Sequence, residues 1–186
     1  MIETAPFQKR SVTLIIPRAY KVYPYAAQAV RLLNDRGWLA FLVTNQAGVA
    51  RGYFAEEMIG AVHQILIDEL EMEGARLNAI YYCPHHPSIG PPAYQLDCDC
   101  RKPKPGLIYR AAAEHDIDLK RSWMVGDRFS DMQLARNAGV RCAFVLSGYG
   151  RGEWEYQRST WSFEPDLIAE NLLDVVRRIT SFEEAA

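Results

Sequence analysis

The stretch Leu39-Ala40-Phe41-Leu42-Val43-Thr44 is a continuous apolar run that ends in a polar residue. A strand that is buried on both faces of a parallel sheet has this pattern. Apolar residues at helical spacing flank the run, over residues 24–36 before it and residues 55–73 after it. Each of these segments stops at a glycine, as helices often do. The run therefore predicts a buried parallel strand between two helices.

The alternation of strand and helix continues along the chain. Further strands are predicted at residues 12–16, 79–83, 123–125, 142–146 and 166–168, and further helices at residues 107–115, 130–138 and 171–179. Such alternation implies right-handed βαβ units, so we expect an α/β fold with a doubly wound parallel sheet. The length of 186 residues matches one domain over residues 1–186.

Composition excludes several classes of protein. Hydrophobic residues make up 49% and charged residues 24% of the chain, which is typical of a globular protein. The net charge of −2 offers no basic footprint for a nucleic acid. No apolar run approaches the roughly 20 residues that span a membrane, and residues 1–9 do not read as a signal peptide. We therefore expect a cytoplasmic protein that binds neither nucleic acid nor membrane.

Three of the four cysteines lie close together in the sequence. Cys83-x-His85 and Cys98-x-Cys100 are separated by twelve residues and supply three thiolates and one imidazole. Zinc in structural sites prefers such a tetrahedral set. His86 is an alternative to His85 at this stage. The loop of about residues 83–102 is therefore predicted to hold a structural Zn²⁺ ion.

Polar residues follow several predicted strands, and functional residues gather at the carboxyl ends of strands in doubly wound sheets. Residues 44–52 contain a hydroxyl, two amides and Arg51. Residues 101–106 place Arg101 and Lys102 just before a predicted helix, whose N-terminus attracts anions. Residues 126–131 contain Asp127 and Asp131, and Asp131 fits a helix cap. These loops fit a phosphate pocket, and from the residues alone an ordinary polar loop at residues 44–52 and a solvated basic turn at residues 101–106 stay open as alternatives.

Three sequence blocks carry a family resemblance. Val43-Thr44-Asn45-Gln46, residues 101–106 and residues 125–132 resemble motifs two to four of the haloacid dehalogenase (HAD) superfamily, in the same order. More narrowly, TNQAGVARG (44–52), YYCPHH (81–86) and CDCRKPKPG (98–106) are similar to the subfamily of heptose bisphosphate and histidinol-phosphate phosphatases. The resemblance covers residues 7–180. It implies a HAD-like Rossmannoid fold with no large cap domain and favours His85 as the zinc ligand.

The resemblance also implies covalent phosphoryl transfer by two aspartates with Mg²⁺. An ungapped match over residues 7–15 puts Lys9 at the nucleophile and Ser11 at the acid/base position. A lysine ammonium does not form an acyl phosphate and repels Mg²⁺, which leaves Asp127 as the residual magnesium position. We therefore expect an inactive or very weak phosphatase relative, with Lys9 within salt-bridge distance of Asp127.

The expected ligand is a phosphorylated small molecule such as a phosphosugar. Two alternatives stay open: an active phosphatase of the heptose bisphosphate or histidinol phosphate type that uses other residues, and a structural interaction protein with a vestigial pocket. We expect a monomer and leave a protein partner open. The expected phosphate and substrate ligands are Thr44, Asn45, Gln46, Arg51, Arg101 and Lys102, and the expected zinc ligands are Cys83, His85, Cys98 and Cys100.

Overall fold

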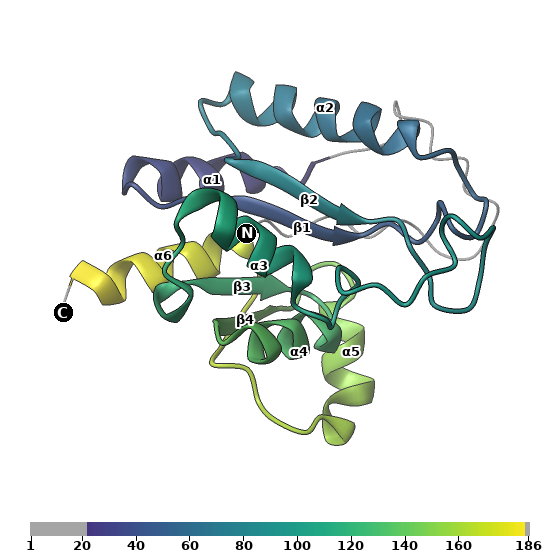
Figure 1. Ribbon diagram of the computed structural model, residues 1–186. Helices are drawn as coiled ribbons and strands as arrows, with labels where there is room; N and C mark the ends of the chain where they lie inside the picture. The colour runs from purple at the N-terminus through teal and green to yellow at the C-terminus, as the bar shows by residue number, and fades with distance from the viewer. Residues whose placement is uncertain (1–21, 185–186) are drawn as a thin grey trace.

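The computed structural model describes residues 22–184 (Figure 1). Strands and helices alternate along the chain, as the sequence predicts. Their bounds, in chain order, are α1 (Ala26–Asp35), β1 (Phe41–Asn45), α2 (Glu57–Met72), β2 (Ala79–Cys83), α3 (Gly106–His115), β3 (Trp123–Gly126), α4 (Phe129–Ala138), β4 (Arg141–Val145), α5 (Gly150–Gln157), β5 (Leu167–Ala169) and α6 (Leu172–Glu184).

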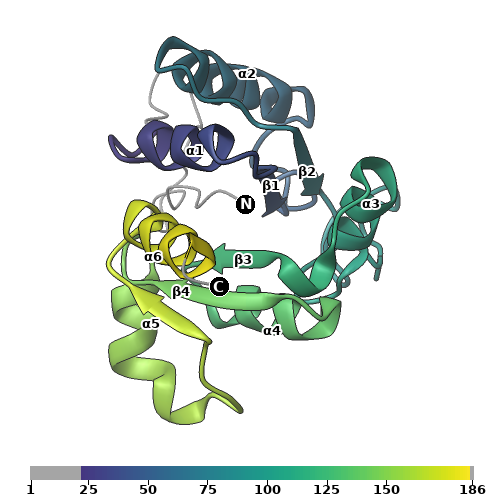
Figure 2. The ribbon, with the colours of Figure 1, turned by 90° about the vertical axis from the view of Figure 1, so that its left-hand side faces the viewer.

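Every strand pair among the described residues is parallel. β1 pairs with β2, starting from Phe41 opposite Ala79, and the second sheet has the order β3-β4-β5. Helices lie on both sides of these sheets (Figure 2). One buried apolar cluster unites residues of α1, α2 and α6 with the strands, and a second cluster unites residues of α3 and α4 with them. The predicted doubly wound α/β architecture is confirmed.

Two elements differ from the prediction. The glycine-rich segment after β4, for which no helix was predicted, forms α5, whose Glu153 is buried. Gly150 and Gly152 lower intrinsic helix propensity, so local sequence gave no helix signal there. α6 extends to Glu184, beyond the predicted end at residue 179. No helix in the described part of the chain is long and apolar enough to cross a membrane. The predicted strand over residues 12–16 lies outside the described residues, as do Lys9 and Ser11.

Candidate functional site

The carboxyl end of β1 is tied to the loop before α3 through one side chain. The Asn45 amide group donates to the Lys102 carbonyl at 3.3 Å, and its carbonyl oxygen accepts from the Lys102 backbone N–H at 3.0 Å. Thr44, next to it, is buried, and the Gln46 amide donates to its hydroxyl. The two loops that the sequence analysis assigned to phosphate binding therefore meet at this edge of the sheets.

The Lys102 ammonium lies between two strand ends. It donates to the carbonyl of Val43 at 3.4 Å and forms an ion pair with Asp131 Oδ1 at 2.7 Å. Both side chains of the ion pair are largely buried, with 15% of Lys102 and 5% of Asp131 exposed. Asp131 Oδ2 also accepts from the Arg128 backbone N–H, which makes it part of a capping box at the start of α4. The predicted capping role of Asp131 is confirmed, and its ion pair with Lys102 is an additional role.

Asp127 follows β3 at the same edge. Its Oδ2 accepts from the Tyr149 backbone N–H at 2.8 Å. Burial raises the pKa of this carboxyl, and the nearby Asp131 carboxylate adds to the rise, while the Tyr149 N–H, Arg128 and Lys102 oppose it. Gly148 has a φ of +62°, and a Cβ there would collide with the Asp127 carboxylate. Gly148 therefore lets the segment before α5 approach Asp127.

Glu153 is a site residue that the sequence analysis missed. Its carboxylate accepts from the Phe129 backbone N–H at 2.8 Å and from the Arg128 guanidinium at 3.2 Å. Arg128 also lies over the Tyr149 ring, at 3.9 Å from the ring centroid. These contacts fasten α5 to the loop that carries Asp127. No local motif marks Glu153, because its partners lie more than twenty residues away in the sequence.

The remaining cations sit around the zinc loop. The Arg101 guanidinium donates to the His85 carbonyl at 3.1 Å. Arg51 is exposed, and its guanidinium lies 3.1 Å from His86 Nε2. Partial desolvation lowers the pKa of His86, and the neighbouring Arg101 and Arg51 lower it further. Arg51, on the loop after β1, therefore lies beside His86, on the loop after β2.

The four predicted zinc ligands converge. Their donor atoms all lie within 4.8 Å of one another, with Sγ of Cys83 at 3.4 Å from Sγ of Cys98 and Nδ1 of His85 at 3.4 Å from Sγ of Cys100. A tetrahedral zinc ion with Zn–S bonds of about 2.3 Å keeps its sulfur ligands about 3.8 Å apart. The donor set and its spacing therefore suit one Zn²⁺ ion.

Comparisons with known proteins agree with this geometry. The HAD-hydrolase-like family matches residues 99–175. The D-glycero-beta-D-manno-heptose-1,7-bisphosphate 7-phosphatase of Rhodopseudomonas palustris is 43% identical over 117 residues, which are 63% of this chain and 65% of the relative. The D-glycero-D-manno-heptose-1,7-bisphosphate 7-phosphatase of Thermosynechococcus vestitus is 42% identical over 165 residues, which are 86% of this chain and 83% of that relative. This chain belongs to the heptose bisphosphate phosphatase family of HAD-like hydrolases.

A solved structure from the same family shows the matching fold. The heptose bisphosphate phosphatase of B. bronchiseptica, complexed with magnesium and phosphate, superimposes with a TM-score of 0.81 at 28% identity. The superposition covers 98% of this chain and 99% of the other. The predicted resemblance to HAD phosphatases is therefore confirmed for both sequence and fold.

Carboxylates are few among the described residues at the carboxyl edge of the strands. Mg²⁺ requires oxygen ligands in near-octahedral geometry. At the carboxyl edge of the strands, Asp131 is already paired with Lys102, which leaves Asp127. Among the described residues, Cys83, His85, Cys98 and Cys100 form the one cluster of three or more potential metal ligands, and its donors are soft. Among the described residues, the Cys83, His85, Cys98 and Cys100 cluster has donors that suit Zn²⁺, and Asp127 is the carboxylate of the strand edge that is not paired with Lys102.

Proposed function

We propose that this chain binds a phosphorylated small molecule at the carboxyl edge of its strands and does not hydrolyse it. Polar and cationic groups of the kind that binds phosphate support this proposal: the Thr44 hydroxyl, the Asn45 amide and the Lys102 ammonium, with Arg51 and Arg101 on the adjoining loops. The two compared relatives are named for a heptose bisphosphate substrate. That name supports a phosphosugar as the class of ligand.

The observation that carries the loss of hydrolysis is the absence of acidic residues near the N-terminus. Between Glu3 and Asp35 the sequence contains no aspartate or glutamate. In the ungapped match, Lys9 and Ser11 stand at the positions of the nucleophile and of the acid/base. Covalent phosphoryl transfer in this family needs a carboxylate nucleophile, and an ammonium does not replace it. A serine nucleophile needs an adjacent base, and no histidine precedes His63 in the chain.

The charge in the pocket also favours binding over turnover. Asp131 is paired with Lys102, so Asp127 is the carboxylate of this edge that forms no ion pair with another described residue. We propose that the cations of this edge hold the phosphate directly, without Mg²⁺. The reaction step then lacks both its nucleophile and the ion that neutralises the transferring group.

The zinc ion belongs to the same proposal. We infer that Cys83, His85, Cys98 and Cys100 hold one Zn²⁺ per chain, since their donor atoms already converge. Arg101 and Lys102 follow Cys100 directly, so the zinc loop fixes the backbone from which both cations project. Thiolate ligands of this kind persist in a reducing compartment, which agrees with a cytoplasmic protein.

The test measures binding and turnover separately. Calorimetry with inorganic phosphate and with heptose phosphates in magnesium-free buffer should detect binding. Phosphate release from heptose bisphosphate with Mg²⁺ should stay at the no-enzyme level. Turnover that Asp127→Asn abolishes would establish an active phosphatase built from other residues and overturn the proposal. If the protein bound no phosphate compound, the proposal would be overturned in favour of a structural interaction protein with a vestigial pocket.

A further inference from the structure

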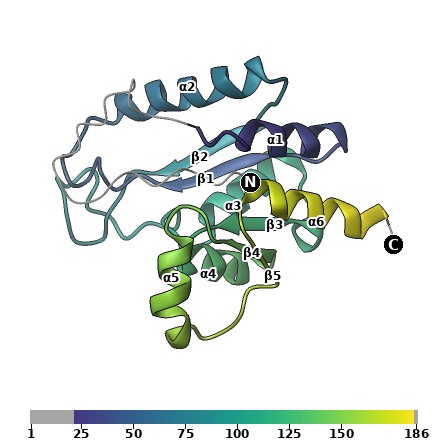
Figure 3. The same cartoon turned by 180° about the vertical axis from the view of Figure 1, so that it is seen from behind.

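Solvent reaches two of the three cysteines in the metal cluster. Cys98 and Cys100 are half-buried, whereas Cys83, the last residue of β2, is fully buried. Asp97, just before Cys98, has 75% of its side chain exposed, whereas the two residues that follow Cys100 are half-buried. Figure 3 shows the loop between β2 and α3 projecting beyond the ends of the strands. A small oxidant dissolved in water can therefore approach Cys98 in the folded protein.

The sulfur of Cys98 lies close to two further thiols. It is 3.4 Å from Sγ of Cys83 and 3.0 Å from Sγ of Cys100. A disulfide between Cys98 and Cys100 would close a small ring around Asp99, whose carbonyl accepts from the Gly106 N–H at 3.0 Å. Cys83 is 15 positions from Cys98, so a bridge between these two closes a loop of ordinary length. Cys83 is therefore the favoured disulfide partner of Cys98.

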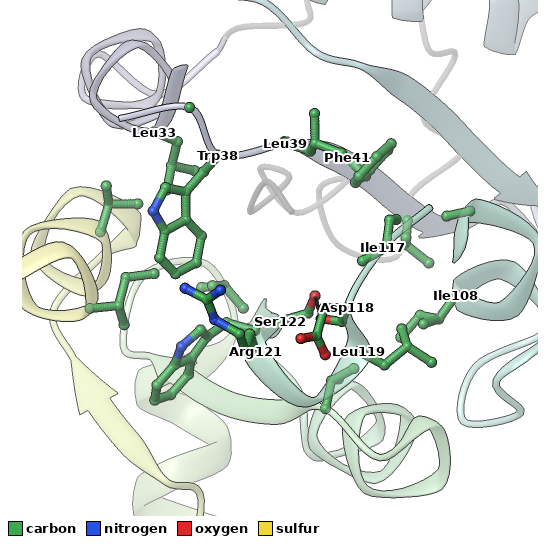
Figure 4. Close-up of a pocket in the computed structure, with 18 of the residues that line it drawn as sticks. Leu33, Trp38, Leu39, Phe41, Ile108, Ile117, Asp118, Leu119, Arg121 and Ser122 are labelled. Carbon is green, nitrogen blue, oxygen red and sulfur yellow. Dashed lines mark hydrogen bonds between the residues drawn. The ribbon is translucent and has the colours of Figure 1, made fainter. Parts of the chain in front are cut away.

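The fourth cysteine differs in each of these respects. Cys142 is fully buried on β4 and lies outside the metal cluster, with its Sγ at 3.3 Å from the Asp166 carboxylate. Burial raises the pKa of Cys142 to about 11, and Asp166 adds to the rise, so this residue is a thiol at neutral pH. A cavity of about 380 Å³ lies between β1 and β3 (Figure 4), but none of the described residues that line it is a cysteine.

We infer that Cys98 is a site of oxidative modification, at which hydrogen peroxide forms a disulfide with Cys83 and thereby releases zinc. The Cys98 thiolate attacks one peroxide oxygen, the O–O bond breaks, and hydroxide leaves behind a sulfenic acid. The Cys83 thiolate then attacks Sγ of Cys98, the S–O bond breaks, and a second hydroxide leaves. In total, two thiolates and one peroxide give one disulfide and two hydroxide ions. The two sulfurs lose the two electrons that the peroxide gains.

This disulfide removes two of the four ligands of the proposed zinc site. His85 and Cys100 remain, and a disulfide offers no thiolate to a metal, so we expect the ion to leave. The loop that it held adjoins the phosphate pocket. The His85 carbonyl accepts from Arg101, and the Asn45 side chain bonds to the Lys102 backbone. Oxidation should therefore also weaken phosphate binding. That consequence rests on the proposed function, whereas the disulfide itself does not.

Peroxide treatment of the zinc-loaded wild-type protein tests the modification site. A chromogenic zinc chelator should detect about one released ion per chain. The mass of the denatured polypeptide should fall by about 2 Da, as one disulfide requires. Mapping of peptic peptides should show residue 83 joined to residue 98, with Cys100 and Cys142 as free thiols. Dithiothreitol with added Zn²⁺ should restore both the mass and the bound metal.

Several results would overturn the inference. These are a bridge between Cys98 and Cys100, a bridge between two chains, and a mass gain of about 32 Da from a sulfinic acid without any bridge. Zinc that stays bound after Cys98 has reacted would overturn it as well. Protein purified without chelators that contained no zinc would refute zinc release, and its peptide map would still decide between Cys83 and Cys100 as the partner.

Cys142→Ala is the matched control, because it removes a buried thiol outside the cluster. The variant should release zinc at the same peroxide concentration as the wild-type protein. In the wild-type protein, Cys142 should react about a hundredfold more slowly than Cys98. Faster oxidation of Cys142, or zinc release that Cys142→Ala prevents, would move the oxidation site away from the cluster and overturn the inference.

Calorimetry with inorganic phosphate tests the link to the pocket. The oxidised protein should bind phosphate about tenfold more weakly than the reduced, zinc-loaded protein. Equal affinity in both states would overturn the link between the cluster and the pocket. Protein that binds no phosphate in either state would refute the proposed function, while the disulfide map and the zinc measurement would still decide the modification site.

Discussion

The zinc cluster and the proposed phosphate pocket lie next to each other, but one is built from a single loop and the other from several separate segments. Four zinc ligands come from two short motifs on one loop, and all four converge. The proposed phosphate pocket draws on the ends of several strands, and the described carboxylates there are Asp127 and the Lys102-paired Asp131. A site built from local spacing stays intact as long as its loop does. A site assembled from separate segments changes its chemistry when one segment changes.

The two sites nevertheless share one piece of backbone. Arg101 donates to the carbonyl of the zinc ligand His85, and Lys102 pairs with Asp131 on the other side. Anything that loosens the zinc loop should therefore disturb the pocket, whereas changes in the pocket should leave zinc in place. Substitutions in the two sites test this asymmetry, from the largest expected effect to the smallest.

The largest effect should follow loss of zinc. Cys98→Ser removes one thiolate ligand, and structural zinc contributes folding free energy directly. We expect zinc content to fall from one ion per chain to near zero, with a loss of about 5 kcal/mol of stability. A loss of this size should lower the melting temperature by about 10 to 20 °C. Metal analysis and calorimetry measure both quantities.

Cys142→Ala is the matched control for this variant. Cys142 is a buried cysteine, whereas Cys98 is half-buried, and Cys142 lies on β4 outside the metal cluster, with its thiol against Asp166. It should keep one zinc ion per chain. A Cys98→Ser protein that retained stoichiometric zinc, or wild-type protein purified without chelators that contained none, would contradict the four-ligand site.

The second effect concerns the Lys102–Asp131 ion pair at the edge where the phosphate pocket is proposed. Lys102→Met keeps the length of the side chain but leaves the buried Asp131 carboxylate without its ammonium. Removing one partner of a buried pair typically costs about 3 to 5 kcal/mol. We expect a matching fall in the free energy of unfolding by urea, no loss of zinc, and no detectable binding of inorganic phosphate.

The double variant Lys102→Met/Asp131→Asn separates stability from binding. Asparagine removes the unpaired charge and keeps an oxygen that can accept from the Arg128 N–H. Much of the lost stability should return, while phosphate binding should not. If stability stayed as low as in Lys102→Met, the damage would come from lost packing of the lysine stem and not from an unpaired charge.

The fold was largely predictable because burial enforces simple patterns. β2 has the predicted bounds, and α1, α2, α3 and β3 begin and end within two residues of their predicted limits. Each has an apolar periodicity of its own and a glycine or polar residue at its boundary. α5 has no apolar periodicity of its own, and its contacts come from Glu153 and from Trp154, which packs on the second apolar cluster. Partners from distant segments leave no local pattern.

The candidate site likewise contains residues that the local sequence predicted and contacts that it did not. The zinc ligands were predictable from C-x-H and C-x-C spacing, and the structure brings them together. The hydrogen bonds between Asn45 and Lys102 join residues 57 positions apart, so sequence indicated the two loops but not their contact. The ion pair of Lys102 with Asp131 was not predicted, because Asp131 already had a sufficient local explanation as a cap.

The third effect concerns Asp127, whose substitution should stabilise the protein. Burial raises the pKa of Asp127, so its charged form is less favourable in the folded state than in the unfolded state. Stability from this group is present below the ordinary aspartate pKa and is lost as pH rises through the raised value. Asp127→Asn should therefore stabilise the protein by about 1 kcal/mol at pH 7. The gain should shrink as pH falls.

The same substitution should tighten phosphate binding. Asp127 repels an anion, and with no magnesium to bridge them its removal should lower the dissociation constant for inorganic phosphate about three- to tenfold, or about 1 kcal/mol. Glu155→Gln, an exposed change on α5, is the control and should alter neither quantity. Weaker phosphate binding by Asp127→Asn in the presence of Mg²⁺ would show that the pocket still uses the metal.

The smallest effect should come from Arg51, which sits at the outer margin of both sites. Its guanidinium lies against His86 and is exposed, so it contributes little to folding. Arg51→Ala should shift the melting temperature by about 1 °C or less and raise the phosphate dissociation constant about threefold. Arg51→Lys keeps the charge but loses the planar guanidinium that binds phosphate through two hydrogen bonds. Its affinity for phosphate should therefore lie between those of the wild-type protein and of Arg51→Ala. Equal affinity in all three proteins would remove Arg51 from the pocket and confine the phosphate contacts to Thr44, Asn45, Arg101 and Lys102.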